Sequence, residues 1–209
     1  MHFPDYSLLY LHAPKTAGNA IQTALIDFSE DQKKQSGHQD GLQTFKVIGP
    51  KTKGKHSTLE DYRETLGADL PSYRVCLSIR HPFDRALSFY FSPHRWFRQA
   101  SNGEYEATQP HWSTTDFEVC LSQMTHMSAF VTVDAIFRMP DFLIRYENLE
   151  NDFQKFISEA GIPASSARLP VMNSSADQTG VKERLRSDKG LARIVSNEFA
   201  DDMNAFAYN

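Results

Sequence analysis

Three short apolar runs, each followed by a turn and a helical pattern, constrain the fold of this chain more than any other feature. The runs cover residues 7–11, 73–79 and 142–146. Runs of this length that do not alternate between polar and apolar residues are typical of strands buried on both faces of a parallel sheet. Because strands that alternate with helices pack into α/β folds, we expect a parallel sheet with helices on both of its faces.

The segments between these runs divide into helices and loops. Apolar residues recur with the spacing of one helix face in three segments, at residues 21–28, 149–157 and 191–206. Ser57, with Glu60 three residues later, predicts a capping box at the start of another helix, and Thr115 is a candidate cap for a further one. Residues 29–56 are polar, so we interpret them mostly as loop, and residues 92–114 are irregular.

Length, charge and cysteine content limit the class of protein. The 209 residues suit one domain, which we expect to span residues 1–209, and the net charge of −4 argues against a nucleic-acid binder. No stretch reaches the ~20 apolar residues that cross a bilayer, and no signal-peptide pattern opens the chain. Cys76 lies in an apolar run and Cys120 in a helical pattern, without a CxxC pair. We therefore expect a cytoplasmic protein with no membrane span.

The first strand-to-helix junction, residues 12–20, has the composition of a phosphate-binding loop. A turn that opens a helix presents backbone N–H groups and the positive end of the helix dipole. Gly18 lets the backbone approach an anion, Lys15 adds a full charge and Thr16 adds a hydroxyl. The Walker pattern is absent, because the lysine precedes the glycine. The alternative is that Lys15 is solvated and Gly18 only packs.

The second junction follows the run at residues 73–79. Arg80 ends the expected strand, Pro82 begins a helix, and Ser88 lies two helical turns further on. An arginine can bind a phosphate with two parallel hydrogen bonds, and a serine can donate one more. The alternative is that Arg80 and Arg85 pair with acidic neighbours and that Ser88 is incidental.

Together the two junctions resemble the sulfotransferase family. The residues that carry the resemblance are Pro14-Lys15-Thr16-Ala17-Gly18 and the pattern R-x-P-x-x-R-x-x-S-x-Y from Arg80 to Tyr90. The similarity is strongest to the branch that contains glycan O-sulfotransferases of the heparan and chondroitin type. It implies the sulfotransferase fold, in which a parallel sheet like that of the P-loop NTPases is flanked by helices.

The resemblance also implies which residues bind the cofactor, 3′-phosphoadenosine 5′-phosphosulfate (PAPS). In this family the first loop binds the 5′-phosphosulfate, the second junction binds the 3′-phosphate, and a later loop closes over the cofactor. The matching residues are Lys15, Thr16, Ala17, Gly18, Asn19 and Ala20, then Arg80 and Ser88, and finally Asn173 and Ser174.

Three positions depart from the family pattern. Asn19 and Ala20 stand where the family usually has threonine or serine, and Ala20 has no side-chain donor. We expect backbone N–H groups to bind the phosphate there. His81 stands where an aspartate is common, which bears on cofactor affinity or on the local loop.

The activity that the resemblance implies is in-line transfer of a sulfuryl group from PAPS to an acceptor hydroxyl, with no metal. Lys15 is the candidate for stabilising the charge on the leaving phosphate. His56 is the candidate base, and His12 is its main rival. The acceptor is open between a glycan, a small alcohol or other small molecule, a lipid headgroup and a tyrosyl peptide. Lys51, Lys53 and Lys55 precede His56 and would guide an acidic acceptor, unless they form a solvated basic loop.

Two other function classes compete with this interpretation. A P-loop-like nucleotide kinase would share the fold class, but it needs a Walker lysine and an acidic residue that binds Mg²⁺. A non-catalytic module that binds PAPS, or its product 3′-phosphoadenosine 5′-phosphate (PAP), would bind without transfer. The departures at Asn19 and Ala20 keep that second alternative open.

Overall fold

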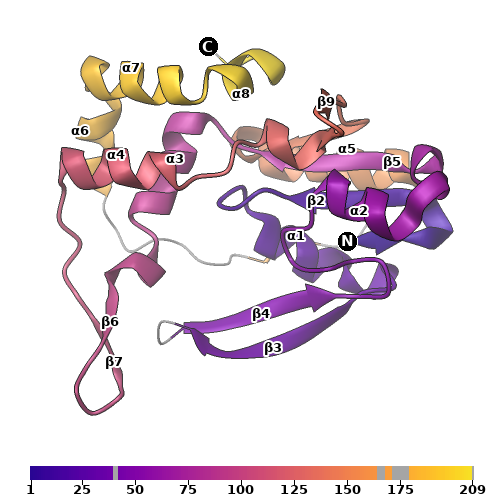
Figure 1. Ribbon diagram of the computed structural model, residues 1–209, viewed down its shortest axis with the longest axis horizontal. Helices are drawn as coiled ribbons and strands as arrows, with labels where there is room; N and C mark the ends of the chain where they lie inside the picture. The colour runs from indigo at the N-terminus through magenta and orange to yellow at the C-terminus, as the bar shows by residue number, and fades with distance from the viewer. Residues whose placement is uncertain (40–41, 164–167, 171–178, 209) are drawn as a thin grey trace. The chain divides into compact units, whose positions relative to one another are not determined.

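The chain forms two compact units in the computed structural model, which describes residues 1–39, 42–163, 168–170 and 179–208 (Figure 1). The first unit comprises Met1–Lys34, Phe45–Arg80 and Met127–Met172. The second comprises Gln35–Thr44, His81–His126 and Asn173–Asn209. Neither unit is one continuous stretch of chain, and a single domain over residues 1–209 stays a prediction.

A four-stranded sheet forms the centre of the first unit. Its strands, in spatial order, are β1 (His2–Phe3), β2 (Leu8–His12), β5 (Arg74–Ile79) and β10 (Phe142–Arg145). Strands β2, β5 and β10 run parallel to one another, and the short β1 pairs antiparallel with β2. The three apolar runs in the sequence therefore form the three parallel strands, each shifted by no more than one residue at either end.

The core of the first unit explains why these runs lack polar alternation. All five residues of β2 are buried, so both faces of the strand are covered. On one face, Tyr10, Cys76 and Ile144 belong to the same apolar cluster as residues of α1 (Gly18–Leu25) and α5 (Leu149–Ala160). The central, mostly parallel sheet flanked by helices confirms the predicted α/β fold class. Cys76 lies in this core, and both cysteines are free and buried.

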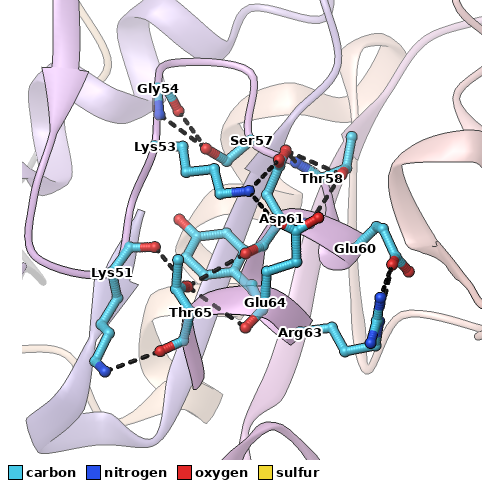
Figure 2. A network of polar contacts seen from close by, with 11 residues as sticks. Lys51, Lys53, Gly54, Ser57, Thr58, Glu60, Asp61, Arg63, Glu64 and Thr65 are labelled. Carbon is cyan, nitrogen blue, oxygen red and sulfur yellow. Dashed lines mark hydrogen bonds and ion pairs between the residues drawn. The ribbon is translucent and has the colours of Figure 1, made fainter. Parts of the chain in front are cut away.

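The helix α2 (Leu59–Leu66) begins one residue later than predicted (Figure 2). Thr58, not Ser57, is the N-cap, and its capping-box partner is Asp61, not Glu60. Ser57 instead closes a turn, since its hydroxyl donates to the Gly54 carbonyl at 2.8 Å. Both registers match the capping-box pattern, and the observed helix begins at Leu59, the first of its buried residues.

The interpretation of residues 29–56 as mostly loop is wrong. This segment contains β3 (Gln32–Gln39) and β4 (Leu42–Ile48), which form a two-stranded sheet. The sequence did not reveal β3 because Gln32–Gln39 contains no apolar residue and therefore has no period-two pattern.

The second unit is mainly helical. Its helices are α3 (Pro82–Tyr90), α4 (Thr114–Ser122), α6 (Thr179–Arg186), α7 (Lys189–Glu198) and α8 (Ala200–Ala205). The predicted helix at residues 191–206 is thus two helices, divided at Phe199, and α4 is capped by Ser113 instead of Thr115. The hairpin of β6 (Phe97–Gln99) and β7 (Tyr105–Ala107) lies in the segment judged irregular. No helix within the described ranges is both long and apolar enough to cross a membrane.

Arg85 serves the fold of the second unit. Its guanidinium is buried, lies 3.9 Å from the equally buried Asp202 carboxylate, and donates to the Thr125 carbonyl at 2.6 Å. Burial lowers the pKa of Arg85 to about 10, which still leaves it charged at neutral pH. The alternative that Arg85, the second arginine of the motif, pairs with an acidic neighbour therefore holds.

Candidate active site

The loop between β2 and α1 has a backbone shape suited to an anion. Lys15 and Ala17 both adopt left-handed conformations, with φ of 72° and 68°, on either side of Thr16. Ala17 is the N-cap of α1, and its carbonyl accepts from the N–H of Ala20 at 3.0 Å. The N–H groups of Gly18 and Asn19 belong to the first helical turn, which an α-helix leaves without intrahelical acceptors. Such a turn binds anions through its N–H groups and its dipole.

A series of hydrogen bonds between buried hydroxyl groups stabilises this loop. Thr16 donates to the Ala13 carbonyl at 2.7 Å, and its oxygen lies 2.7 Å from the Ser78 hydroxyl, which accepts from Tyr10 at 2.9 Å. Because the single Thr16 proton goes to the carbonyl, Ser78 must donate to Thr16. Thr16 is fully buried and its hydroxyl proton is used within the protein, so this hydroxyl is not available to an anion as considered in the sequence.

Gly18 is required by the packing of His12. A Cβ atom at Gly18 would lie 1.8 Å from Cδ2 of the buried His12 ring. The ring cannot withdraw freely, since its Nδ1 is hydrogen-bonded to Oε1 of Gln22 at 3.2 Å. The glycine in the motif therefore allows the imidazole of β2 to pack directly on the first turn of α1.

We expect Gly18→Ala to lower the free energy of unfolding by about 1–3 kcal/mol, the usual cost of overpacking. Helix propensity alone would favour alanine by up to ~1 kcal/mol, so the sign of the change separates the two effects. Chemical denaturation measures it. Gly54→Ala is the control, because a Cβ at Gly54 meets nothing within 4 Å. A stabilised Gly18→Ala protein would contradict the packing of His12 on the helix.

Two histidines from distant parts of the sequence meet beside the loop. The rings of His12 and His56 lie 4.5 Å apart between centroids, and His56 is the exposed member of the pair. Nδ1 of His56 lies 2.9 Å from the backbone carbonyl of His12. Since a carbonyl can only accept, Nδ1 carries the proton and the neutral ring has its lone pair on Nε2.

His12 differs from His56 in its surroundings. It is only 4% exposed. Burial, together with the neighbouring His56 and Lys55, holds the pKa of His12 well below its usual value. His12 is therefore neutral at neutral pH and is enclosed by protein, whereas His56 is open to an incoming molecule.

The three lysines before His56 differ in their contacts, and Figure 2 shows the first two, Lys51 and Lys53. Lys51 donates to the Thr65 carbonyl at 2.8 Å, and Lys53 forms ion pairs with Glu64 and Asp61 of α2. Both therefore bind the neighbouring helix of their own unit. The third, Lys55, has a different set of contacts.

The ammonium groups of Lys55 and of a lysine from the hairpin both lie over the same aromatic ring. Its Nζ lies 4.1 Å from the centroid of Phe45, and Nζ of Lys33 lies 4.3 Å from the same centroid. Burial, and secondarily the charge of Lys33, lowers the pKa of Lys55 to about 8. Lys33 and Phe45 were missed in the sequence because they fall in the segment interpreted as loop.

Arg80 connects the carboxyl ends of the parallel strands. Its guanidinium carbon lies 3.7 Å from the centroid of Tyr146, which follows β10, and one NH₂ group donates to the Lys15 carbonyl at 3.4 Å. Arg80 itself follows β5 directly. The structure thus brings Arg80 to the first loop, as expected for junctions at one edge of a parallel sheet.

The remaining residues singled out in the sequence lie in the second unit or outside the described ranges. Ser88 is half-buried in α3 of the second unit, and Asn173 and Ser174 lie outside the described residues. At the N-cap of α3, Nδ1 of His81 accepts from the N–H of Phe83 at 3.2 Å. An aspartate would cap the helix in the same way, so the departure at His81 keeps a local structural role.

The described residues contain no cluster of metal-ligating side chains. No three or more His, Cys, Asp or Glu side chains in those ranges are arranged to bind a metal ion. A reaction without metal stays a prediction.

Comparison with known proteins gives one result. Residues 1–209 match the family model described as Sulfotransferase family. No curated protein and no solved structure matches the chain.

Proposed function

The chain belongs to the sulfotransferase family, and on that premise we propose that it transfers the sulfuryl group of PAPS to an acceptor hydroxyl. The observation that carries the proposal is the carboxyl edge of the sheet. There the anion-binding turn at Lys15 meets Arg80, and His56 is hydrogen-bonded to the strand residue, His12, that precedes the turn.

The donor groups at this edge fit an anionic nucleotide. The N–H groups of the first turn of α1 and the Lys15 ammonium would bind the 5′-phosphosulfate, and Arg80 would bind the 3′-phosphate. PAPS supplies the activated sulfuryl group and a phosphate leaving group. A role for Ser88 at the 3′-phosphate stays a prediction from the sequence motif.

His56 is the base of the proposed reaction. Its Nε2 carries the lone pair and accepts the proton of the acceptor hydroxyl as that oxygen bonds to sulfur. Lys15 and the loop N–H groups stabilise the negative charge that develops on the opposite side of the reacting centre. The buried His12 stays neutral, so it does not repel the imidazolium that forms at His56.

The lysines beside His56 support an acceptor that carries negative charge. Lys33 and Lys55 are held over one phenyl ring, and Lys55 directly precedes the proposed base in sequence. Two ammonium groups placed together favour a carboxylate or sulfate over a neutral molecule. We therefore place an acidic glycan ahead of an uncharged small alcohol as the acceptor.

Transfer of radiolabelled sulfate from PAPS tests the proposed function. The acceptors are a uronic-acid polysaccharide, a neutral polysaccharide of similar length and a small alcohol. We expect label on the uronic-acid polymer. If only the neutral acceptors became labelled, the proposal that the acceptor is negatively charged would be contradicted. PAP binding without transfer to any acceptor would favour the non-catalytic module, and Mg²⁺-dependent phosphate transfer from ATP would favour a kinase.

The affinity for an anionic acceptor should depend on pH through Lys55. This side chain is charged below its pKa of about 8 and loses its charge as the pH rises through that value. We expect KM for the acidic acceptor to rise above that pH, and the rise to disappear in Lys55→Met. Acceptor kinetics across the range measure this. The same rise in Lys55→Met would assign the effect to another group.

A further inference from the structure

A buried glutamine on α1 links the two histidines of the site. Gln22 is 1% exposed and uses both ends of its side-chain amide. Its Oε1 lies 3.2 Å from Nδ1 of His12, and its Nε2 donates to the backbone carbonyl of Lys55 at 3.0 Å. One side chain therefore holds β2 to the segment that carries the proposed base.

Two backbone carbonyls determine which nitrogen carries the proton in each of these hydrogen bonds. The Lys55 carbonyl can only accept, so the NH₂ group of Gln22 faces it and Oε1 faces His12. Nδ1 of His12 must then carry a proton and donate to Oε1. The His12 carbonyl, which also can only accept, receives the Nδ1 proton of His56 at 2.9 Å.

The hydrogen bonds form a closed circuit through the chain. They run from Lys55 to Gln22, from Gln22 to His12 and from His12 to His56, and the peptide bond joins His56 back to Lys55. Gln22 therefore sets how far the carbonyl of His12 lies from the ring of His56. Without this link, an exposed histidine can rotate and adopt either tautomer.

We propose that Gln22 is a positioning residue that keeps the lone pair of His56 on Nε2, where the acceptor hydroxyl needs it. This inference rests on the proposed function for its catalytic consequence. The titratable groups that act on His12 are His56, Lys55 and the N-terminal ammonium of Met1, and Lys33 acts on Lys55 in turn. The amide of Gln22 does not titrate, so it holds the same hydrogen-bond direction across the working pH range.

Gln22→Met tests the proposal, because methionine fills similar space without the hydrogen bonds. We expect kcat to fall about 10- to 100-fold, as when other partners that orient histidines are removed, with KM for PAPS unchanged. The acid limb of the pH–rate profile should also move. Gln22→Glu should show a similar defect, because a carboxylate cannot donate to the Lys55 carbonyl. Gln154→Ala, at a surface glutamine of α5, is the control.

Nitrogen-15 NMR of the histidine rings supplies a readout that does not depend on activity. In the wild-type protein, His12 and His56 should both carry the neutral-ring proton on Nδ1, and in Gln22→Met the His56 signal should become a mixture of tautomers. A wild-type His56 protonated on Nε2 would overturn the inference even if the variants fail to fold. An unchanged tautomer and pH profile in Gln22→Met would also overturn it. Absence of sulfuryl transfer by the wild-type protein, with these tautomers observed, would instead reject the proposed function.

Discussion

His56→Asn is expected to lower kcat by about 10²- to 10⁴-fold, the usual contribution of a general base. Asparagine retains a donor that can reach the His12 carbonyl, so the local backbone should stay in place, but it cannot accept the acceptor's proton at neutral pH. PAP affinity should not change, because His56 is assigned to the acceptor side of the reaction. Steady-state kinetics and calorimetric titration with PAP measure the two quantities.

The control for this variant is His111→Asn, at an exposed histidine of the second unit. It should leave kcat unchanged. A His56→Asn enzyme with wild-type kcat would contradict the assignment and would return His12 to consideration as the base, despite its burial. Loss of PAP binding together with kcat would mean that His56 supports the cofactor site instead of the proton transfer.

Lys15→Met is expected to lower kcat by about 10²- to 10³-fold, as when one group that stabilises transition-state charge is removed. Methionine is nearly as long as lysine and meets the same backbone constraint at φ of 72°, so the substitution removes the charge with little other change. The fold decrease in kcat should exceed the fold decrease in PAP affinity, since negative charge on the leaving phosphate grows in the transition state.

The control here is Lys46→Met, which removes an exposed lysine from β4 in the same unit. It should leave kcat and PAP affinity unchanged. If Lys15→Met reduced PAP affinity as much as kcat/KM, Lys15 would act only in ground-state binding. If it changed neither, the alternative that Lys15 is a solvated loop residue would stand.

The parallel strands and their junctions could be predicted from the sequence because local pattern determines them. A strand buried on both faces is mostly apolar, as β2 is, and Gly161, with φ of 77°, ends α5 in the left-handed conformation that favours glycine. Strand β3 (Gln32–Gln39) could not be predicted, because it contains no apolar residue and its pairing partner is not specified by local pattern. The capping box shifted by one residue because two overlapping matches to its pattern differ only in the residue at which the helix begins.

The candidate site likewise has some features that could be predicted from the sequence and others that could not. The positions of Lys15 and Arg80 followed from the rule that parallel strands place their carboxyl ends at one edge. The occupied hydroxyl of Thr16 and the His12 ring on Gly18 depend on how the loop folds back on itself, and the amide of Gln22 also contacts the distant Lys55. No spacing in the sequence records such contacts. Gln22 in particular reads as one polar residue in an amphipathic helix.

Calorimetric titration of the purified protein with PAP, compared with 5′-AMP, tests the central claim most directly. The two nucleotides differ at the 3′-phosphate, which Arg80 is proposed to bind. We expect PAP to bind more tightly than 5′-AMP, and Arg80→Ala to weaken PAP binding by at least about tenfold, or 1.4 kcal/mol, with little effect on 5′-AMP. Equal binding of the two nucleotides, or no binding of PAP, would contradict the assignment of this edge of the sheet to PAPS.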